Sequence, residues 1–180
     1  TSQEIIKKTV DAMLATDGLT VHDLKPIMVP NLVRGVDDLV SGRADITTFA
    51  LGSAKVSEAD AAVGGIRFIS LPNTPAALKG LKSEFRTAYI AEAKPSPRYA
   101  GVKEPINIMQ YDYTVFAGAK YPADKVKQIT DILATHKDAL GASHPLFKSM
   151  EVNRMFTDIE VPYHDGAKAY YAEKGIKETK

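Results

Sequence analysis

Two stretches of the chain decide its fold: GRADITTFALG at residues 42–52 and IRFISLP at residues 66–72. Each contains an apolar run with β-branched or aromatic residues, as buried strands do. The segment between them, residues 57–63, has the composition of a short helix, with Ser57 and Asp60 at a spacing that resembles a capping box. We therefore predict adjacent strands at 44–51 and 66–71, and connections this short indicate a parallel pair.

The same alternation continues on both sides of these stretches. Helical periodicity or capping residues predict further helices at 1–17, 32–40 and 76–85, from Pro122 onward, and at 166–173. Apolar runs or alternation predict further strands at 27–29, 89–91 and 106–117. Strands that alternate with helices indicate an α/β fold with a largely parallel sheet.

Composition and motifs exclude several classes of function. The 23 basic and 22 acidic residues are nearly balanced, which argues against a nucleic-acid-binding protein. The sequence has no cysteine, and its four histidines do not stand at metal-ligand spacing. It also contains none of the GxSxG, GxxxxGK[ST] or GxGxxG motifs. We expect no catalytic residue, no metal and no cofactor, and no apolar run is long enough to cross a membrane.

Three stretches, in their order along the chain, resemble a known family. They are the strand–helix–strand region at 42–72, YTVFA at 113–117 leading into YPADKV at 121–126, and VPYHDGAKAYYAEKG at 161–175. Together they resemble the solute-binding proteins of TRAP transporters of the TAXI type (TRAP-associated extracytoplasmic immunogenic proteins). The last stretch is the most specific, because it is similar to the pattern with which that family closes.

The resemblance implies a fold and a domain organisation. The family has two α/β lobes around a cleft, of the type II periplasmic-binding-protein kind, and its members carry a first lobe ahead of the region matched here. We expect residues 1–24 to form a segment at the lobe junction and residues 25–100 to form the second α/β lobe with a parallel-rich sheet. Residues 101–180 are expected to return to the first lobe and to pack on it through C-terminal helices.

A candidate ligand site follows from the general rule that α/β folds bind ligands beyond the carboxyl ends of their strands. The strand ends at Phe49, whose ring can offer a flat apolar wall to the ligand. It leads to Gly52, which lets a ligand approach the backbone closely, and to Ser53, which offers a hydroxyl. The TAXI pattern usually has GGxP at this loop, whereas this chain has Gly-Ser-Ala-Lys, so the individual contacts stay open. An ordinary turn after a buried strand is the alternative interpretation.

The resemblance adds a second loop to this candidate site. Tyr99 stands where the family tends to have a tyrosine after a proline-containing loop, and the neighbouring Arg98 can bind a carboxylate through two parallel hydrogen bonds. The family also has an anion-binding turn near the positions of Thr1 and Ser2. By contrast, His164, Tyr170 and Tyr171 are interpreted as scaffold of the closing helix.

These observations predict a periplasmic, exported solute-binding protein that is not an enzyme. The expected ligand is a small organic anion or an amino acid such as glutamate, and the expected partners are the membrane permease subunits of a TRAP transporter. Two alternatives remain open on the same fold, an effector-binding domain of a regulator and an enzyme, because a fold does not determine a function.

Overall fold

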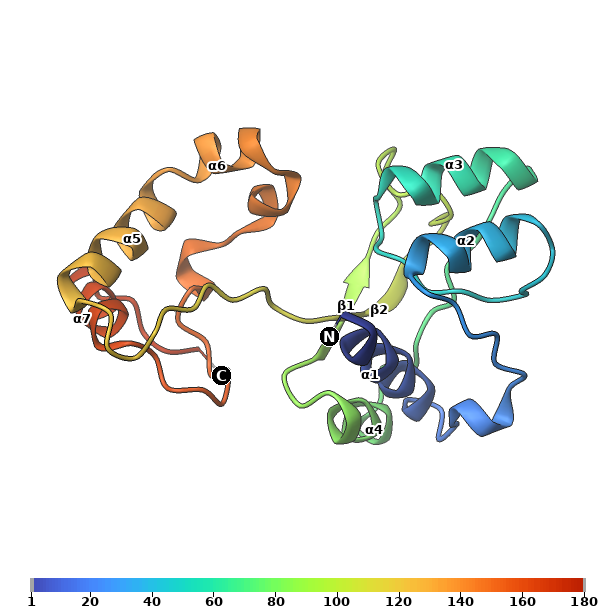
Figure 1. Ribbon diagram of the computed structural model, residues 1–180, viewed down its shortest axis with the longest axis horizontal. Coiled ribbons are helices and arrows are strands. Elements are labelled where there is room, and N and C mark those ends of the chain that lie inside the picture. The colour runs from blue at the N-terminus through green and yellow to red at the C-terminus, as the bar shows by residue number, and fades with distance from the viewer. Residues whose placement is uncertain (1, 180) are drawn as a thin grey trace. The chain divides into compact units, whose positions relative to one another are not determined.

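The computed structural model describes the backbone of residues 2–179, with side chains except at residues 2, 3, 145 and 146. The chain forms two compact units, unit 1 from Thr1 to Asp112 and unit 2 from Tyr113 to Lys180. Their colours in Figure 1 run from blue to yellow-green and from yellow to red. The division of the complete protein into lobes at residues 24 and 100 stays a prediction.

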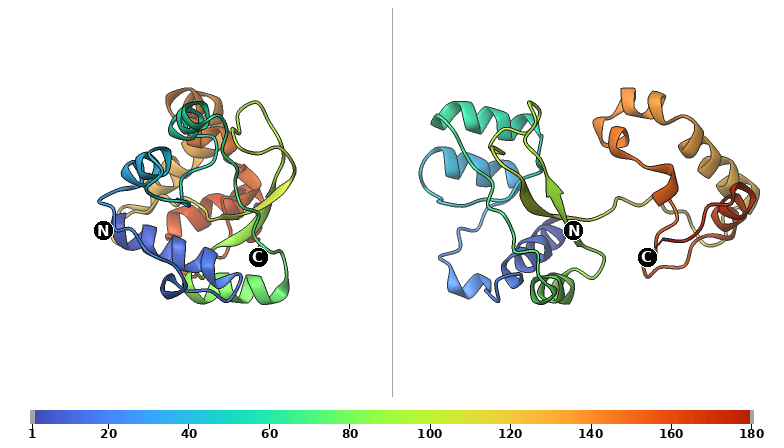
Figure 2. Two further views of the ribbon diagram at one scale, coloured as in Figure 1. Left: turned by 90° about the vertical axis from the view of Figure 1, so that its right-hand side faces the viewer. Right: turned by 180° about the vertical axis from the view of Figure 1, so that it is seen from behind.

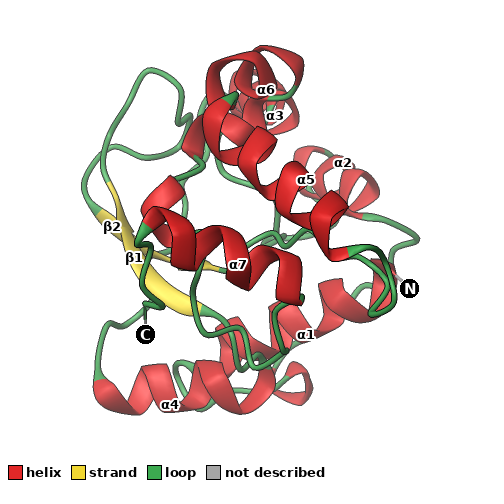
Figure 3. Cartoon of the chain, turned by 90° about the vertical axis from the view of Figure 1, so that its left-hand side faces the viewer, coloured by secondary structure: helices red, strands yellow, loops and turns green. Residues whose placement is uncertain are grey.

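Helices are the prevailing regular elements of both units, as Figure 3 shows. Unit 1 contains α1 (Ser2–Ala15), the 3-10 helix η1 (Val21–Asp23), α2 (Leu32–Val40), α3 (Ala54–Val63), α4 (Pro75–Glu84), β1 (Tyr89–Ala93) and β2 (Ile106–Gln110). Unit 2 contains α5 (Ala123–Thr135), α6 (Lys137–Ser143), η2 (Pro145–Ser149), η3 (Val152–Arg154) and α7 (Asp165–Lys174). Mixed helices and strands are consistent with the α/β class.

The helices α2, α3, α4 and α7 each begin after a residue whose side chain accepts an N–H of the first turn. Asn31 caps α2 by accepting from the Arg34 N–H, and Thr74 caps α4, whose first residue is Pro75. The helices predicted at 32–40 and 76–85 are thereby confirmed. The helix predicted at 57–63 is α3, and its predicted start at Ser57 is wrong, because Ser53 caps it and the helix begins at Ala54.

The predicted parallel sheet is absent from the described residues. Their one sheet pairs β1 and β2 antiparallel, in a register that runs from Tyr89 opposite Gln110 to Ala93 opposite Ile106. This pairing confirms a strand at 89–91 and shortens the one predicted at 106–117. Residues 27–29, 44–51 and 66–71 are not strands in this structure.

The 66–71 segment nevertheless lies beside β2 and the loop before it. The Phe68 N–H donates to the Gly101 carbonyl (3.2 Å) and the Leu71 N–H to the Asn107 carbonyl (2.9 Å). Between these bonds, the Asn107 N–H donates to the hydroxyl of Ser70 (3.0 Å) instead of to a backbone carbonyl. The Ser70 hydroxyl thus takes the place of a backbone carbonyl that would pair the two segments as strands. This substitution accounts for why residues 66–71 lie beside β2 without forming a strand.

Unit 1 has two buried clusters, one at each end of the β1–β2 pair. Ala12, Leu81 and Ala88 form the first, where α1 packs on α4. Ala93 with Val102 and Ile106 forms the second. Figure 2 shows α2 beside α3 at one end of unit 1 and α1 beside α4 at the other. The second cluster is the one that supports the candidate site.

The core of unit 2 is aromatic. The ring of Tyr171 stacks on Phe156 at a centroid distance of 4.8 Å, and Tyr163 meets Phe156 edge-on at 4.9 Å. His164 caps α7, since its Nδ1 accepts the Gly166 N–H (3.1 Å), and Tyr170 and Tyr171 are buried. These contacts confirm the interpretation of the three predicted residues as scaffold.

Candidate functional site

The loop that leads into α3, residues 49–53, is held by its own backbone. The Ser53 N–H donates to the Ala50 carbonyl (3.3 Å), and Gly52 has the left-handed φ of +75°. The Ser53 hydroxyl accepts the Val56 N–H (3.3 Å) as the cap of α3. Sequence reasoning assigned this hydroxyl to a ligand, whereas its acceptor capacity serves the helix start in this structure.

The second loop, residues 96–102, connects β1 and β2 through two consecutive turns. The Tyr99 N–H donates to the Ser96 carbonyl (2.9 Å), and the Val102 N–H donates to the Tyr99 carbonyl (3.1 Å). Ser96 also accepts the Arg98 N–H through its hydroxyl (3.3 Å). Tyr99 therefore belongs to both turns, and its backbone has little freedom to shift.

These two loops meet. A Cβ atom added to Gly52 would lie 3.0 and 3.1 Å from Cε1 and Cδ1 of Tyr99 and 3.5 Å from the Arg98 carbonyl. Leu51 and Tyr99 both pack against the cluster of Ala93, Val102 and Ile106. In Figure 1 the 96–102 loop is the yellow-green segment beside the start of α3. Three of the predicted site residues, Gly52, Arg98 and Tyr99, are thus brought together.

The remaining predicted residues differ in their placement. Phe49 is half-buried and takes part in none of the ring contacts or core clusters found among the described residues. Thr1 lies outside the described residues, as does the side chain of Ser2, so the expected anion-binding turn is not described. Ser53 adjoins Gly52 in the same loop.

The charged side chains near these loops are of two kinds, those held in ion pairs and those exposed to solvent. Lys55, in the first turn of α3, pairs with Asp37 of α2 (2.9 Å) and with Glu58 (3.4 Å). The hydrogen bond to Asp37 is the largest cause of the raised pKa of Lys55. Arg98 is exposed, and its guanidinium forms no ion pair within the described part of the chain. It is consequently the cation of these loops that can bind an anion.

Residues that the sequence did not single out complete the geometry. Gly101 rests against Phe68 and Ile66, at distances of 3.3 and 3.1 Å from an added Cβ. This contact fastens the 96–102 loop to the 66–71 segment. Its only signal in the sequence is a glycine two positions after the tyrosine, and the identity of its partner depends on tertiary structure.

Other kinds of site find no support in the described residues. No group of three or more histidine, aspartate or glutamate side chains could hold a metal ion among residues 2–179. Over the same residues, no helix has the length and apolarity that a membrane span needs. Two open depressions of about 380 and 400 Å³ lie in unit 2, one between α5 and α7 and one at α6. Both are open to solvent, and neither includes a predicted site residue, so we give more weight to the meeting loops.

Comparison with known proteins yields one family. The model of the NMT1-like family matches residues 4–175, nearly the whole chain. No curated protein matches the sequence. The match includes both units and both site loops.

Proposed function

The chain belongs to the NMT1-like family, a periplasmic-binding-protein-like family related to solute-binding proteins, and on that premise we propose that it captures a small solute for uptake. The proposed solute is an organic anion or an amino acid similar to glutamate. The proposed partner is the permease of a TRAP transporter, the proposed location is the periplasm, and the protein is proposed to catalyse no reaction. The TAXI assignment rests on the resemblance of 42–72, 113–126 and 161–175.

The observation that carries this proposal is the meeting of the two loops at Gly52 and Tyr99. Tyr99 is half-buried, and none of the hydrogen bonds described for residues 2–179 involves its hydroxyl. Beside it stands the exposed guanidinium of Arg98, whose planar fork matches a carboxylate. The turns hold the backbone of both residues and the buried cluster supports the Tyr99 ring, so ligand binding has to order mainly the side chain of Arg98.

Calorimetric titration of the protein with a panel of solutes tests this proposal. The panel contains L-glutamate, succinate and glutarate as anions, L-alanine as a neutral solute and L-lysine as a cation. We expect anions to bind, and we expect Arg98→Gln to weaken their binding about 10- to 100-fold, because a hydrogen bond to a charged group is worth about 1.5–3 kcal/mol.

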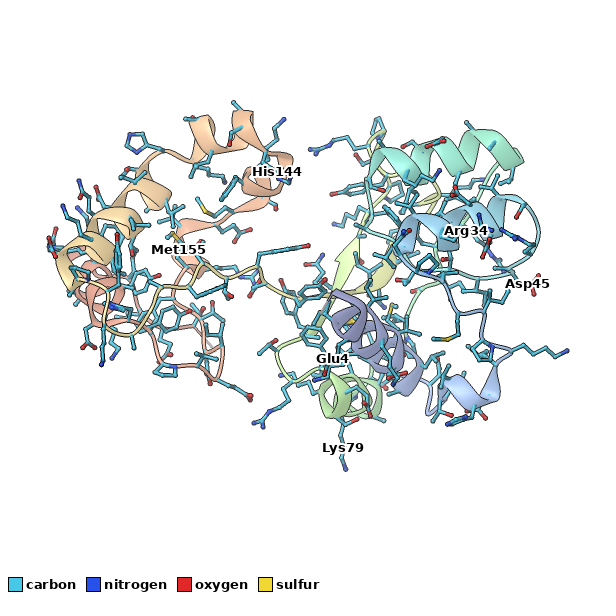
Figure 4. All side chains as sticks on the ribbon, viewed as in Figure 1. Glu4, Arg34, Asp45, Lys79, His144 and Met155 are labelled. Carbon is cyan, nitrogen blue, oxygen red and sulfur yellow. The ribbon has the colours of Figure 1, made fainter. Side chains whose placement is uncertain are left out.

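The control is Lys79→Gln. Lys79 is an exposed cation on α4, and Figure 4 shows it at the end of unit 1 opposite α3. This variant should retain the affinity of the unaltered protein. Equal affinity in Arg98→Gln would contradict the proposed anion site. Recovery of a chemically altered solute after incubation would favour an enzyme over a binding protein.

A further inference from the structure

The two site loops come close together at a glycine, Gly52. Van der Waals contacts of a real Cβ lie at about 3.4–4 Å, whereas an added Cβ at Gly52 would be 3.0 and 3.1 Å from two carbons of the Tyr99 ring. The ring therefore occupies the space that a side chain at position 52 would need. The sequence predicts that Gly52 lets a ligand approach the backbone, and in the structure the Tyr99 ring also approaches it.

The left-handed backbone does not account for this contact. Gly64, which ends α3, has a φ of +74° against +75° for Gly52, yet an added Cβ at Gly64 would meet no atom within 4 Å. Both positions favour glycine for conformational reasons. Of these two positions, Gly52 alone has an aromatic ring in the space that a side chain would take.

We propose that Gly52 is a positioning residue of the solute site, because its missing side chain lets the Tyr99 ring rest on the 49–53 loop at a fixed depth. This inference rests on the proposed function. The depth at which the Tyr99 ring rests determines how much space the bound solute has beside the ring. A methyl group at position 52 displaces the ring outward, which narrows the site.

Hydrogen bonds hold the 96–102 loop on both sides of Tyr99. Its backbone N–H and carbonyl are both hydrogen-bonded within the loop turns. Farther along the loop, Gly101 is fastened to the 66–71 segment through the Phe68 N–H (3.2 Å). These bonds oppose a shift of the whole loop, so we expect a substitution at Gly52 to turn the ring about its side-chain bonds.

Proton NMR tests the contact without a ligand. The Gly52 Hα that a Cβ would replace points at the Tyr99 ring, so the ring current should shift its resonance out of the ordinary glycine range. Tyr99→Leu should return that resonance to the ordinary glycine range. An ordinary Gly52 Hα resonance that Tyr99→Leu leaves unchanged would overturn the proposal.

Titration with succinate and glutarate tests the positioning role. Gly52→Ala and the control Gly64→Ala introduce a methyl group at the same φ, so damage to the backbone alone should affect both variants alike. We expect Gly52→Ala to weaken the binding of glutarate, the longer acid, at least about threefold more than that of succinate. Gly64→Ala should leave the ratio of the two affinities unchanged.

A second background separates ring displacement from loop damage. In Tyr99→Leu no ring is present, so adding Gly52→Ala should leave the affinity ratio for the two acids unchanged. An unaltered ratio in Gly52→Ala itself, with the unaltered protein binding both acids, would overturn the positioning role and leave the proposed function standing. Absence of binding by the unaltered protein would refute the proposed function and, with it, this role.

Discussion

At the scale of single residues, Tyr171 is both a core residue of unit 2 and a titratable group whose pKa is changed by its burial. Its ring lies in the aromatic core, and its hydroxyl donates to the Met155 carbonyl (2.9 Å). Burial raises the pKa of Tyr171 to about 12 from its ordinary value of 10. The neutral phenol is therefore the form that the folded unit accommodates.

Replacing this hydroxyl should destabilise unit 2. Tyr171→Phe retains the stacked ring but leaves the Met155 carbonyl without its partner, at an expected cost of about 1–2 kcal/mol in the free energy of unfolding. Tyr170→Phe is the control, because Tyr170 is equally buried and its hydroxyl donates no hydrogen bond among those described. Urea denaturation of the two variants measures the difference, and equal stabilities would contradict the role of this bond.

The raised pKa of Tyr171 also predicts a dependence of stability on pH. Between pH 10 and pH 12 the folded chain keeps a proton on Tyr171 that the unfolded chain releases. This contribution to stability is complete below pH 10 and is lost as the pH rises through the folded-state pKa. In urea denaturation across this range, Tyr171→Phe should show a shallower loss of stability than the unaltered protein. A parallel loss in both proteins would show that Tyr171 is not responsible.

At the scale of elements, the start of α3 distinguishes two interpretations of one segment. The spacing of Ser57 and Asp60 predicts a cap at Ser57, whereas the structure uses Ser53. We expect Ser53→Ala to cost about 1 kcal/mol in the free energy of unfolding, because the Val56 N–H loses its acceptor. Ser57→Ala, on the exposed face of the helix, should be neutral or slightly stabilising. If chemical denaturation showed Ser57→Ala to be more destabilising than Ser53→Ala, the helix would begin at Ser57, as the sequence predicts.

A second element-level prediction concerns the packing of α4 on α1. A Cβ at Gly80 would lie 2.1 Å from the Ala15 carbonyl oxygen, so the two helices touch through backbone at this point. Although alanine favours helices over glycine, we expect Gly80→Ala to destabilise the protein by about 1–3 kcal/mol through overpacking. Lys82→Ala, at an exposed position of α4, should change stability by less than about 0.5 kcal/mol. Thermal unfolding compares the two, and a stabilised Gly80→Ala would show that the helices are farther apart.

The elements also show which features a sequence can predict. Helices with a polar cap and a proline, such as α4 after Thr74, are predictable because their signals are local. The 66–71 segment was predicted as a strand from its apolar run. Whether such a run becomes a strand depends on its neighbour, and the Ser70 hydroxyl takes the Asn107 N–H that a ladder would use. Gly52, Arg98 and Tyr99 were predicted together, whereas the contact of Gly101 with Phe68 joins distant segments that no local pattern relates.

At the scale of the whole molecule, the chain consists of two units joined after Asp112. The residues at the start of unit 2 are exposed, and Val115 and Phe116 keep 71% and 93% of their accessible surface. The aromatic side chains of Phe116 and of Tyr113, which is 72% exposed, suit the cleavage preference of chymotrypsin, and exposed backbone is where proteases act first. We expect limited proteolysis to cut at 113–116 before any helix and to release fragments that correspond to the two units. Mass spectrometry identifies the sites, and first cuts within α1–α4 would contradict this division.

The central claim is that unit 1 holds the solute where the 49–53 and 96–102 loops meet. Amide chemical-shift mapping of the protein, titrated to saturation with L-glutamate or succinate, tests this claim most directly. We predict that the largest shift changes fall on Gly52, Ser53 and Tyr99, with small changes throughout α5 and α7. Changes concentrated in unit 2, around the depression between α5 and α7, with the two loops unaffected, would contradict it.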